Sequence, residues 1–442
     1  MKKKIAIIGG GIAGLTSAYL LQRKHDVTLF EKSSRVGGNA YMIQTPEGED
    51  VDLAVAAFGK SGYANFYALL NELGVDTDAC ANTFMSFHNM DSGEGLYLTP
   101  SLKGGMSQGF DLFKPKNLKN LLDMFIGMKK AKKLMAQGKL KGLLMREALE
   151  LIPDITGNGK LVFLGTLCLL SSMECHEVLD TPAEFFIGKL TCHNDVISPK
   201  FLYSVRAIVG GTKEYVNALS SHFSDSIEYN STVETVLRDD EGVTLVMEGG
   251  DKRAFDEVVF ACNADQALAL INEPTELEKE LLSPWKYKIG KIVVHKDHSA
   301  FPPKHLIQAY TYLYNASDKD VMSTSVNGAL WYEPYVSDSC DYISSQHPNF
   351  PIRDDLKIFD STFRTPIFSF DAIATQDRLP SLNGKMHSFF CGSHFKYGLH
   401  NDAVTSAYDV ASHFGIEGPS EQTGVLETGI KDIFKMASRF RS

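Results

Sequence analysis

Two short apolar segments that flank a run of glycines open this chain of 442 residues. Residues 4–8 and 27–30 are rich in aliphatic side chains and predict two buried strands, and residues 15–23 predict a helix. The glycine-rich turn at residues 9–14 joins the first strand to the helix. Strand, glycine turn, helix and strand in this order predict a parallel α/β unit that holds the pyrophosphate of a dinucleotide at its helix start.

Three glycines of this turn have different structural roles. Gly9 permits the tight turn out of the strand, Gly11 lets a phosphate approach the backbone, and Gly14 lets the helix pack close to the sheet. The helix start, with Ile12 and Ala13, offers free N–H groups and the positive end of the helix dipole. Together these features predict a phosphate cradle.

An acidic residue ends the second strand, and a basic turn follows it. Glu31 can accept hydrogen bonds from both ribose hydroxyls of an adenosine, and it would repel a 2′-phosphate. Lys32 comes next, and then Arg35 precedes the adjacent glycines Gly37 and Gly38. Two glycines beside a basic residue suit a backbone that lies against a second phosphate or a ring system, and a simple β-turn is the structural alternative.

Composition excludes several classes of protein. Hydrophobic residues are 44% and charged residues 22%, as in ordinary globular proteins, and the net charge of −10 argues against nucleic acid as a partner. Seven cysteines without a C-x-x-C pair favour a reducing, cytoplasmic compartment. The apolar stretch at residues 161–173 is too short to span a bilayer as a helix. The pairs Cys175-His176 and Cys192-His193 lack the spacing of a zinc site, so we expect no metal.

Three further stretches lie in the order in which a known family carries them, at residues 206–212, 255–268 and 390–402. With the opening motif, they make the chain resemble the flavin-containing amine oxidase superfamily, which includes monoamine oxidases, protoporphyrinogen oxidase and carotenoid desaturases. The chain is most similar to a bacterial subgroup of FAD/NAD-binding proteins associated with cyclopropane-fatty-acid biosynthesis. The resemblance implies FAD as the cofactor. Cys391 precedes the C-terminal flavin motif instead of following it, so we expect the FAD to be non-covalent.

The resemblance implies an α/β fold, α+β overall, with a discontinuous Rossmann-like FAD-binding domain. A mixed substrate domain of sheet and helices would complete it. The FAD-binding domain would comprise residues 1–55, 205–265 and 381–415, the substrate domain residues 56–204 and 266–380, and the C-terminal tail and helix residues 416–442.

The resemblance also assigns contacts with FAD along the chain. The backbone of Val233 would lie near the adenine, and Ala261 would lie near the ADP part. Gly392 would lie near the pyrophosphate, while Ser393 stands where the family often has an acid. The helix start at residues 402–404 would stabilise negative charge on the reduced flavin. The full set of expected cofactor-binding residues is Gly9, Gly11, Ile12, Ala13, Gly14, Glu31, Lys32, Arg35, Gly37, Gly38, Val233, Ala261, Gly392, Ser393, Asp402, Ala403 and Val404.

Four side chains are candidates for the chemistry. Amine oxidases often place a lysine near flavin N5, and Lys291 matches that position approximately, although an exposed lysine at a strand end is the structural alternative. His295 and His400 could transfer protons because imidazole titrates near neutral pH, and either could equally be a structural core residue. Tyr397 lies in the segment expected to pass the flavin, where it could position a substrate or pack against the ring.

A basic segment spans residues 114–146, where ten lysines and arginines are opposed only by Asp123. Apolar residues recur beside them at helical spacing. They are Leu118, Leu121, Leu122, Phe125 and Met128. A basic amphipathic helix suits an anionic membrane surface, and a solvated surface helix is the alternative. We therefore expect a cytoplasmic protein with peripheral contact at the inner face of the membrane.

The chain has a single dinucleotide fingerprint, which argues against a reductase that takes electrons from NAD(P)H. The leading hypothesis is an FAD-dependent oxidoreductase, an oxidase or desaturase, that acts on a hydrophobic, lipid-like acyl substrate by hydride transfer to flavin N5. The alternatives are an amine or imine oxidase of a small-molecule pathway, a flavin-dependent double-bond isomerase, and a non-catalytic flavoprotein subunit. A homodimer is a further candidate assembly.

Overall fold

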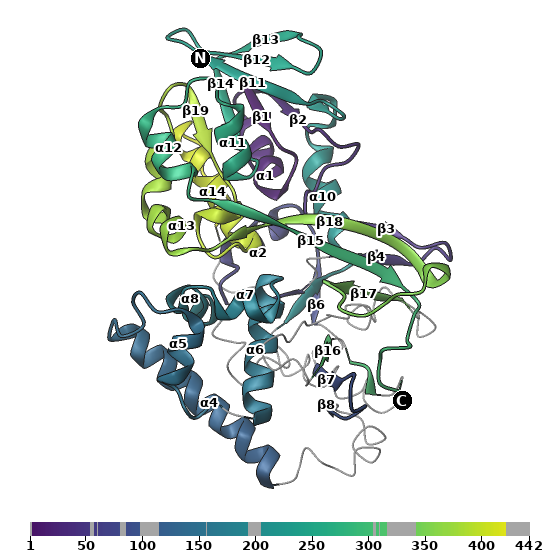
Figure 1. Ribbon diagram of the computed structural model, residues 1–442. Coiled ribbons are helices and arrows are strands. Elements are labelled where there is room, and N and C mark those ends of the chain that lie inside the picture. The colour runs from purple at the N-terminus through teal and green to yellow at the C-terminus, as the bar shows by residue number, and fades with distance from the viewer. Residues whose placement is uncertain are drawn as a thin grey trace.

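A five-stranded parallel sheet forms the upper part of the computed structural model (Figure 1). Its order is β10-β2-β1-β14-β19, with every neighbouring pair parallel. The bounds are β1 (Lys4–Ile8), β2 (Asp26–Phe30), β10 (Ile227–Glu228), β14 (Glu257–Phe260) and β19 (Ser388–Phe390). The structure describes residues 2–53, 57–59, 61–79, 85–97, 115–155, 157–192, 205–303, 306–308, 310–315 and 342–420.

The central strand β1 is apolar along its length because both of its faces are covered. Ile5 and Ile7 belong to one core cluster, and Ala6 and Ile8 belong to another on the opposite face. Successive side chains of a strand point to opposite faces, so a doubly covered strand needs a continuous apolar run. This is why the sequence of the strand shows no alternation.

Helices cover one face of this sheet, and the other face packs against residues 233–247 together with two further helices. Helix α1 (Ile12–Leu21), every residue of which is buried, packs against α14 (His400–His413) and α10 (Thr212–Ser221). Helices α11 (Ala264–Leu270) and α12 (Glu276–Leu282) follow β14. The first helix begins three residues earlier than its apolar pattern indicates, because Gly11 is its N-cap and the glycine turn already belongs to its first turn.

Smaller sheets make up the rest of the strands, and they are antiparallel except for the parallel pair of residues 85–89 with residues 310–314. Strands β11 (Val233–Arg238), β12 (Val243–Met247) and β13 (Lys252–Phe255) form a three-stranded sheet at the upper end (Figure 1). The remaining short strands are β3 (Met42–Gln44), β4 (Asp50–Asp52), β5 (Ala57–Phe58), β6 (Thr77–Ala79), β7 (Met85–Asn89), β8 (Gly95–Tyr97), β9 (Arg206–Ile208) and β16 (Tyr310–Tyr314).

Two long antiparallel strands cross the middle of the molecule (Figure 1). They are β15 (Lys286–His295) and β18 (Lys357–Ile367), which pair along their whole length, and β17 (Ile343–Gln346) pairs with the far end of β15. In Figure 1 these strands lie between the five-stranded parallel sheet above and a group of helices below. Any ligand of the upper sheet that extends downward therefore meets these strands.

The lower part is mostly helical. Its helices are α4 (Pro115–Ala136), α5 (Met145–Glu150), α6 (Gly157–Ser171), α7 (Cys175–Leu179) and α8 (Ala183–Cys192).

The remaining helices lie outside this group. Helix α2 (Ala64–Glu72) packs against α14, and α13 (Phe370–Thr375) follows β18. The 3-10 helices are η3 (Ser224–Ser226), η6 (Asp354–Leu356), η7 (Gln376–Leu382) and η8 (Ser393–Phe395).

The basic segment is helical over only part of its length, which corrects the expectation for residues 114–146. Helix α4 ends at Ala136, and turns follow up to Gly142. Gly138 and Gly142 take φ values of +68° and +75°, which a glycine adopts readily and which end a right-handed helix. Residue 114 lies outside the described residues.

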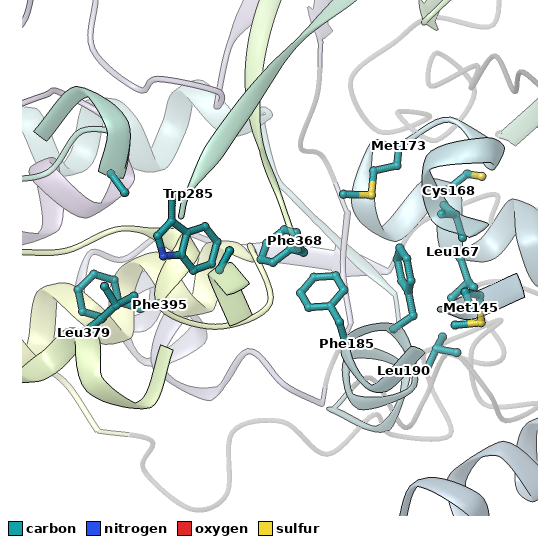
Figure 2. Close-up of a cluster of buried hydrophobic side chains, with 14 of the residues drawn as sticks. Met145, Leu167, Cys168, Met173, Phe185, Leu190, Trp285, Phe368, Leu379 and Phe395 are labelled. Atoms are coloured by element: carbon teal, nitrogen blue, oxygen red, sulfur yellow. The ribbon is translucent and has the colours of Figure 1, made fainter. Parts of the chain in front are cut away.

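One hydrophobic cluster joins the upper and lower parts (Figure 2). Trp285 is fully buried and donates a hydrogen bond from Nε1 to Thr375 Oγ1 at 3.0 Å. Its ring meets Phe368 edge to face, and Phe368 stacks on Phe185 of α8 with ring centres 3.9 Å apart. The core therefore continues from the sheet side into the helices.

The fold class expected from the sequence is confirmed: a Rossmann-like unit is assembled from separated segments and joined to a mixed half of strands and helices. The domain boundaries stay a prediction. None of the described helices combines the length and the apolar character that crossing a bilayer requires. The expected C-terminal helix falls at residues 421–442, outside the described residues.

Candidate cofactor and active site

A cavity of about 640 Å³ opens at the carboxyl ends of β1, β2 and β14, beside the N-termini of α1 and α14. Parallel α/β sheets bind their ligands at this edge. Expected cofactor-binding residues from all three separated segments line it. They are Gly9, Gly11, Ile12, Ala13, Glu31, Lys32, Gly37, Gly38, Val233, Ala261, Gly392, Ser393 and Ala403.

The first glycine turn has the geometry of a phosphate cradle. A Cβ on Gly14 would lie 1.9 Å from the carbonyl oxygen of Gly9, so this glycine serves helix packing and does not line the cavity. A Cβ on Gly11 would meet nothing within 4 Å, because it would point into open space. No side chain caps the start of α1, which leaves its N–H groups available to an anion.

The second glycine turn packs directly on the first. Gly37 donates its N–H to the carbonyl oxygen of Gly10 at 2.7 Å, and a Cβ on Gly38 would lie 3.0 Å from the Cα of Gly11. The φ of +105° at Gly37 is one that residues with a side chain rarely adopt. The two motifs, which are separated in the sequence, therefore form one continuous wall of backbone.

Arg35 has a different place from the one expected. Its guanidinium lies 3.5 Å from the ring centre of Tyr41 and donates to the carbonyl oxygen of Gly38 at 3.1 Å. It is not among the residues that line the cavity. Burial lowers the pKa of Arg35 from its ordinary value. The arginine therefore stabilises the glycine turn through the carbonyl of Gly38. The backbone of the turn lines the cavity, and the guanidinium of Arg35 does not.

Glu31 faces the cavity with a carboxylate that is already partly engaged. One oxygen accepts from the N–H of Gly10 and the other from the N–H of Ser33, both at 2.8 Å. Each carboxylate oxygen can accept a second hydrogen bond. The expected contact with ribose hydroxyls therefore remains available, and the two backbone bonds fix where it would be made.

The start of α14 reaches the cavity through fewer residues than expected. Asp402 is 6% exposed and accepts from the N–H groups of Tyr397 and Leu399 at 3.0 and 2.9 Å, so it organises the preceding turn from inside the protein. Burial raises its pKa. Val404 is fully buried in the core. Of the three predicted residues only Ala403 lines the cavity.

His400 is the one catalytic candidate that lines the cavity. Its Nε2 lies 2.7 Å from the hydroxyl of Tyr215, and its ring packs against Phe58 and Phe66. Burial lowers the pKa of His400 to about 4, and the positive end of the helix dipole acts in the same direction. The imidazole is therefore neutral near pH 7, where it can exchange a hydrogen bond without carrying charge.

The structure does not bring Lys291, His295 or Tyr397 to the cavity wall. Lys291 is exposed because successive side chains of a strand point to opposite faces, and its neighbours Gly290 and Ile292 on β15 are buried. Its Nζ forms an ion pair with Asp360 at 4.0 Å. Tyr397 packs against Phe185, and its carbonyl oxygen accepts from Nζ of the buried Lys189 at 2.9 Å.

His295 is a structural residue. It is 0% exposed, and its Nδ1 accepts from the N–H of Asp297 at 3.1 Å, so the ring proton lies on Nε2 and donates to Ser345 Oγ at 2.9 Å. Burial lowers the pKa of His295 to about 4. With both nitrogens in use, this ring has no atom left for a substrate.

Arg364 is the functional candidate that sequence reasoning missed. It lies on β18, lines the cavity, forms an ion pair with Asp265 of α11, and stands 5.5 Å from the ring centre of Tyr287. Its Nε is buried and has no hydrogen-bond partner among the described residues. No local motif marks this position, because the contact depends on how β18 crosses the sheet edge.

A small acidic cluster is the strongest metal candidate among the described residues. Glu174, His176 and Glu177 bring potential ligand atoms within 4.8 Å of one another. However, Glu177 accepts from the N–H of Glu174 at 2.8 Å as part of the helix cap and forms an ion pair with Lys288. The carboxylate of Glu177 is therefore already engaged in a helix cap and an ion pair. His193 lies outside the described residues.

Comparisons with known proteins agree with the geometry. The family described as flavin containing amine oxidoreductase matches residues 12–290. Zeta-carotene desaturase of Zea mays is 32% identical over 78 residues, and protoporphyrinogen oxidase of Bos taurus is 30% identical over 119. These matches cover 17% and 23% of this chain, and only 14% and 25% of the two relatives. The short matches therefore show a relationship over part of each chain only.

Solved structures extend the likeness over the whole fold. A fatty acid isomerase from P. acnes gives a TM-score of 0.68 at 15% identity, over 94% of this chain and 99% of that one. Putrescine oxidase bound to putrescine gives 0.65 at 13%, over 94% and 99%. Identities this low show the fold alone. The superfamily resemblance seen in the sequence is confirmed, and the cyclopropane-fatty-acid subgroup stays a prediction.

FAD is the cofactor of this family, and the cavity fits it. The open space beside Gly11 and the uncapped start of α1 are where a pyrophosphate needs room and N–H donors. Cys391 is fully buried, with its Sγ 3.6 Å from Ser17 Oγ, and does not line the cavity. That placement agrees with the expected non-covalent attachment.

Proposed function

The chain belongs to the flavin-containing amine oxidoreductase family, and we propose that it is an FAD-dependent oxidoreductase that oxidises a hydrophobic, lipid-like acyl substrate. Bound FAD supplies a hydride acceptor, the N5 atom of its flavin ring. The protein's part is to hold the cofactor, orient the substrate and exclude water. We assign the pyrophosphate to the turn around Gly11, the ribose to Glu31, the adenine to Val233 and the flavin to the start of α14.

The charge of the cavity wall carries the proposal on substrate class. Glu31 is the only acidic residue that lines the cavity in the described part of the chain, and it lies at the nucleotide end beside Gly10. On the β18 wall, Arg364 holds a buried Nε–H without a hydrogen-bond partner among the described residues. Arg364 keeps its ion pair with Asp265, and an acyl carboxylate would satisfy the remaining Nε–H donor, whereas a protonated amine offers no acceptor for it.

Apolar and aromatic side chains accompany Arg364. Leu270, Tyr287, Phe363 and Leu399 line the same cavity. A wall of this kind gains from contact with hydrocarbon, and one cation then orients the polar end. The match to a carotene desaturase supports a lipid-like substrate.

A flavin-dependent double-bond isomerase is the second candidate, because the fatty acid isomerase shares the fold over 94% of this chain. Putrescine oxidase shares it to a similar extent, so the fold by itself does not separate acyl from amine substrates. The two acyl reactions differ in mass balance. A desaturase removes two hydrogens from the substrate, and an isomerase removes none.

The test is anaerobic incubation of the FAD-loaded protein with long-chain fatty acids and with alkylamines of the same length. A desaturase or oxidase would bleach the flavin absorbance with fatty acids, and mass spectrometry would find a product two hydrogens lighter. An isomerase would leave the flavin oxidised at the end and give a product of unchanged mass. Bleaching by amines alone would overturn the acyl proposal.

A further inference from the structure

Helix α4 has two apolar faces, and only one of them is buried. Met124, Met128 and Ala131 are 5%, 4% and 1% exposed and belong to the main hydrophobic cluster. Gly127 lies so close to Ile155 that a Cβ there would be 2.4 Å from its side chain. This face holds the helix to the protein, and it satisfies the usual reason for an apolar stripe.

The second apolar face is exposed. Leu118, Leu122, Phe125 and Ile126 are 46%, 60%, 36% and 47% exposed. At about 100° of rotation per residue these positions share one stripe, on a different side of the helix from Met124 and Met128. Single exposed apolar residues are ordinary on a protein surface, but a contiguous row on one helix indicates a contact surface.

Lysines continue this stripe toward the end of the helix. At the same rotation per residue, Lys129 and Lys133 fall on the exposed apolar face, and both are exposed. Neither forms an ion pair with another described residue, whereas Lys119 pairs with Asp123 and Lys130 with Asp154. The chain as a whole carries a net charge of −10, so the positive charge of this helix face is opposite in sign to the charge of the whole protein.

We propose that this exposed face of α4, formed by Leu118, Leu122, Phe125, Ile126, Lys129 and Lys133, docks on an anionic lipid surface. A helix lying in the membrane interface needs apolar side chains that enter the acyl region and cations that meet the headgroups. Helix α4 runs along the lower edge of the molecule, far from the parallel sheet (Figure 1). Docking there is separate from the flavin chemistry and stands or falls independently of it.

The test is flotation of the full-length, FAD-loaded protein with vesicles of phosphatidylcholine, with and without phosphatidylglycerol. We expect binding to the anionic vesicles at low salt, weaker binding at high salt, and little binding to neutral vesicles. The double variant Leu122→Gln/Phe125→Gln should lower the partition coefficient by about tenfold or more, since it removes two apolar groups from the interface. Lys129→Gln/Lys133→Gln should lower it and flatten its salt dependence.

Matched controls use exposed residues elsewhere. Ile289→Gln changes an apolar side chain that is 72% exposed on β15, and Lys252→Gln removes an exposed lysine on β13. Both should leave vesicle binding unchanged. Flavin content and the unfolding midpoint show that each variant is folded. Absence of binding at low salt, or equal losses in the controls, overturns the proposal. Light scattering that shows a dimer broken only by Leu122→Gln/Phe125→Gln assigns the face to a second copy and also overturns it.

Discussion

Replacing Gly11 by alanine should separate cofactor binding from folding. A Cβ at Gly11 meets no atom within 4 Å, and its φ of −71° suits any residue, so the free energy of unfolding of the FAD-free protein should change little. Loss of the most flexible residue from the unfolded chain could even stabilise it by about 0.4–1 kcal/mol. The new methyl group, however, occupies the open space that a phosphate needs.

The expected loss of affinity follows from the hydrogen bonds at the start of α1. A hydrogen bond to a charged group contributes about 1.5–3 kcal/mol, and about 1.4 kcal/mol corresponds to a factor of ten in a dissociation constant. Displacing the phosphate from one such N–H should therefore weaken FAD binding by roughly ten- to a hundredfold. Titration of the FAD-free protein, followed by quenching of flavin fluorescence, measures the change directly.

Gly14→Ala is the matched variant for packing. Its Cβ would lie 1.9 Å from the carbonyl oxygen of Gly9, so helix and strand would have to separate. Overpacking of this kind costs about 1–3 kcal/mol or more, and urea denaturation should show it without any FAD present. If Gly11→Ala binds FAD as tightly as the native protein, or if it destabilises the FAD-free protein as much as Gly14→Ala does, the cradle interpretation is wrong.

Three further predictions concern the substrate wall, pH and the core. Arg364→Gln should raise KM for a fatty acid by about ten- to a hundredfold, through loss of a charge-assisted hydrogen bond. It should change KM for the methyl ester little, and Arg378→Gln, which breaks an exposed pair with Glu280, should change neither. The pKa of the buried His295 is about 4, below the 6.5 of an unfolded histidine, so the unfolded state binds more protons between these values. Stability is therefore full above pH 6.5 and falls toward pH 4 by roughly 3 kcal/mol from this residue; denaturation at several pH values should show a flatter profile for His295→Gln. Phe185→Ala should lower the free energy of unfolding by about 3–5 kcal/mol, because it removes the ring stacked on Phe368; calorimetry that shows a loss near zero would contradict the shared core.

Local motifs in the sequence predicted many of the residues that line the cavity. The turn from Gly9 to Gly14 and the acid at Glu31 act through backbone geometry within one strand–helix–strand unit, so their spacing alone carries the information. The contact of the second glycine turn with the first depends on Gly37 folding back on Gly10, and no spacing rule states it.

Residues on the long strands could not be placed in the same way. Whether Lys291 or its neighbours face the cavity depends on the register of β15 against β18, and a shift of one residue exchanges the faces. Arg364 was missed for the same reason, since its importance comes from where β18 crosses the sheet edge. Periodicity predicted an amphipathic α4, but it could not reveal that the helix has a second, buried face packed near Ile155.

The stack of Phe185 on Phe368 limits how relatives of this chain could be recombined. Phe368 follows β18, the strand that carries Arg364 into the cavity, whereas Phe185 belongs to α8 of the helical half. A chimera that grafts α8 from another protein without the strand would lose both the ring contact and the alignment of the cavity wall. The helical half is therefore not an exchangeable module, and substrate range should change through substitutions on the wall more readily than through swapped segments.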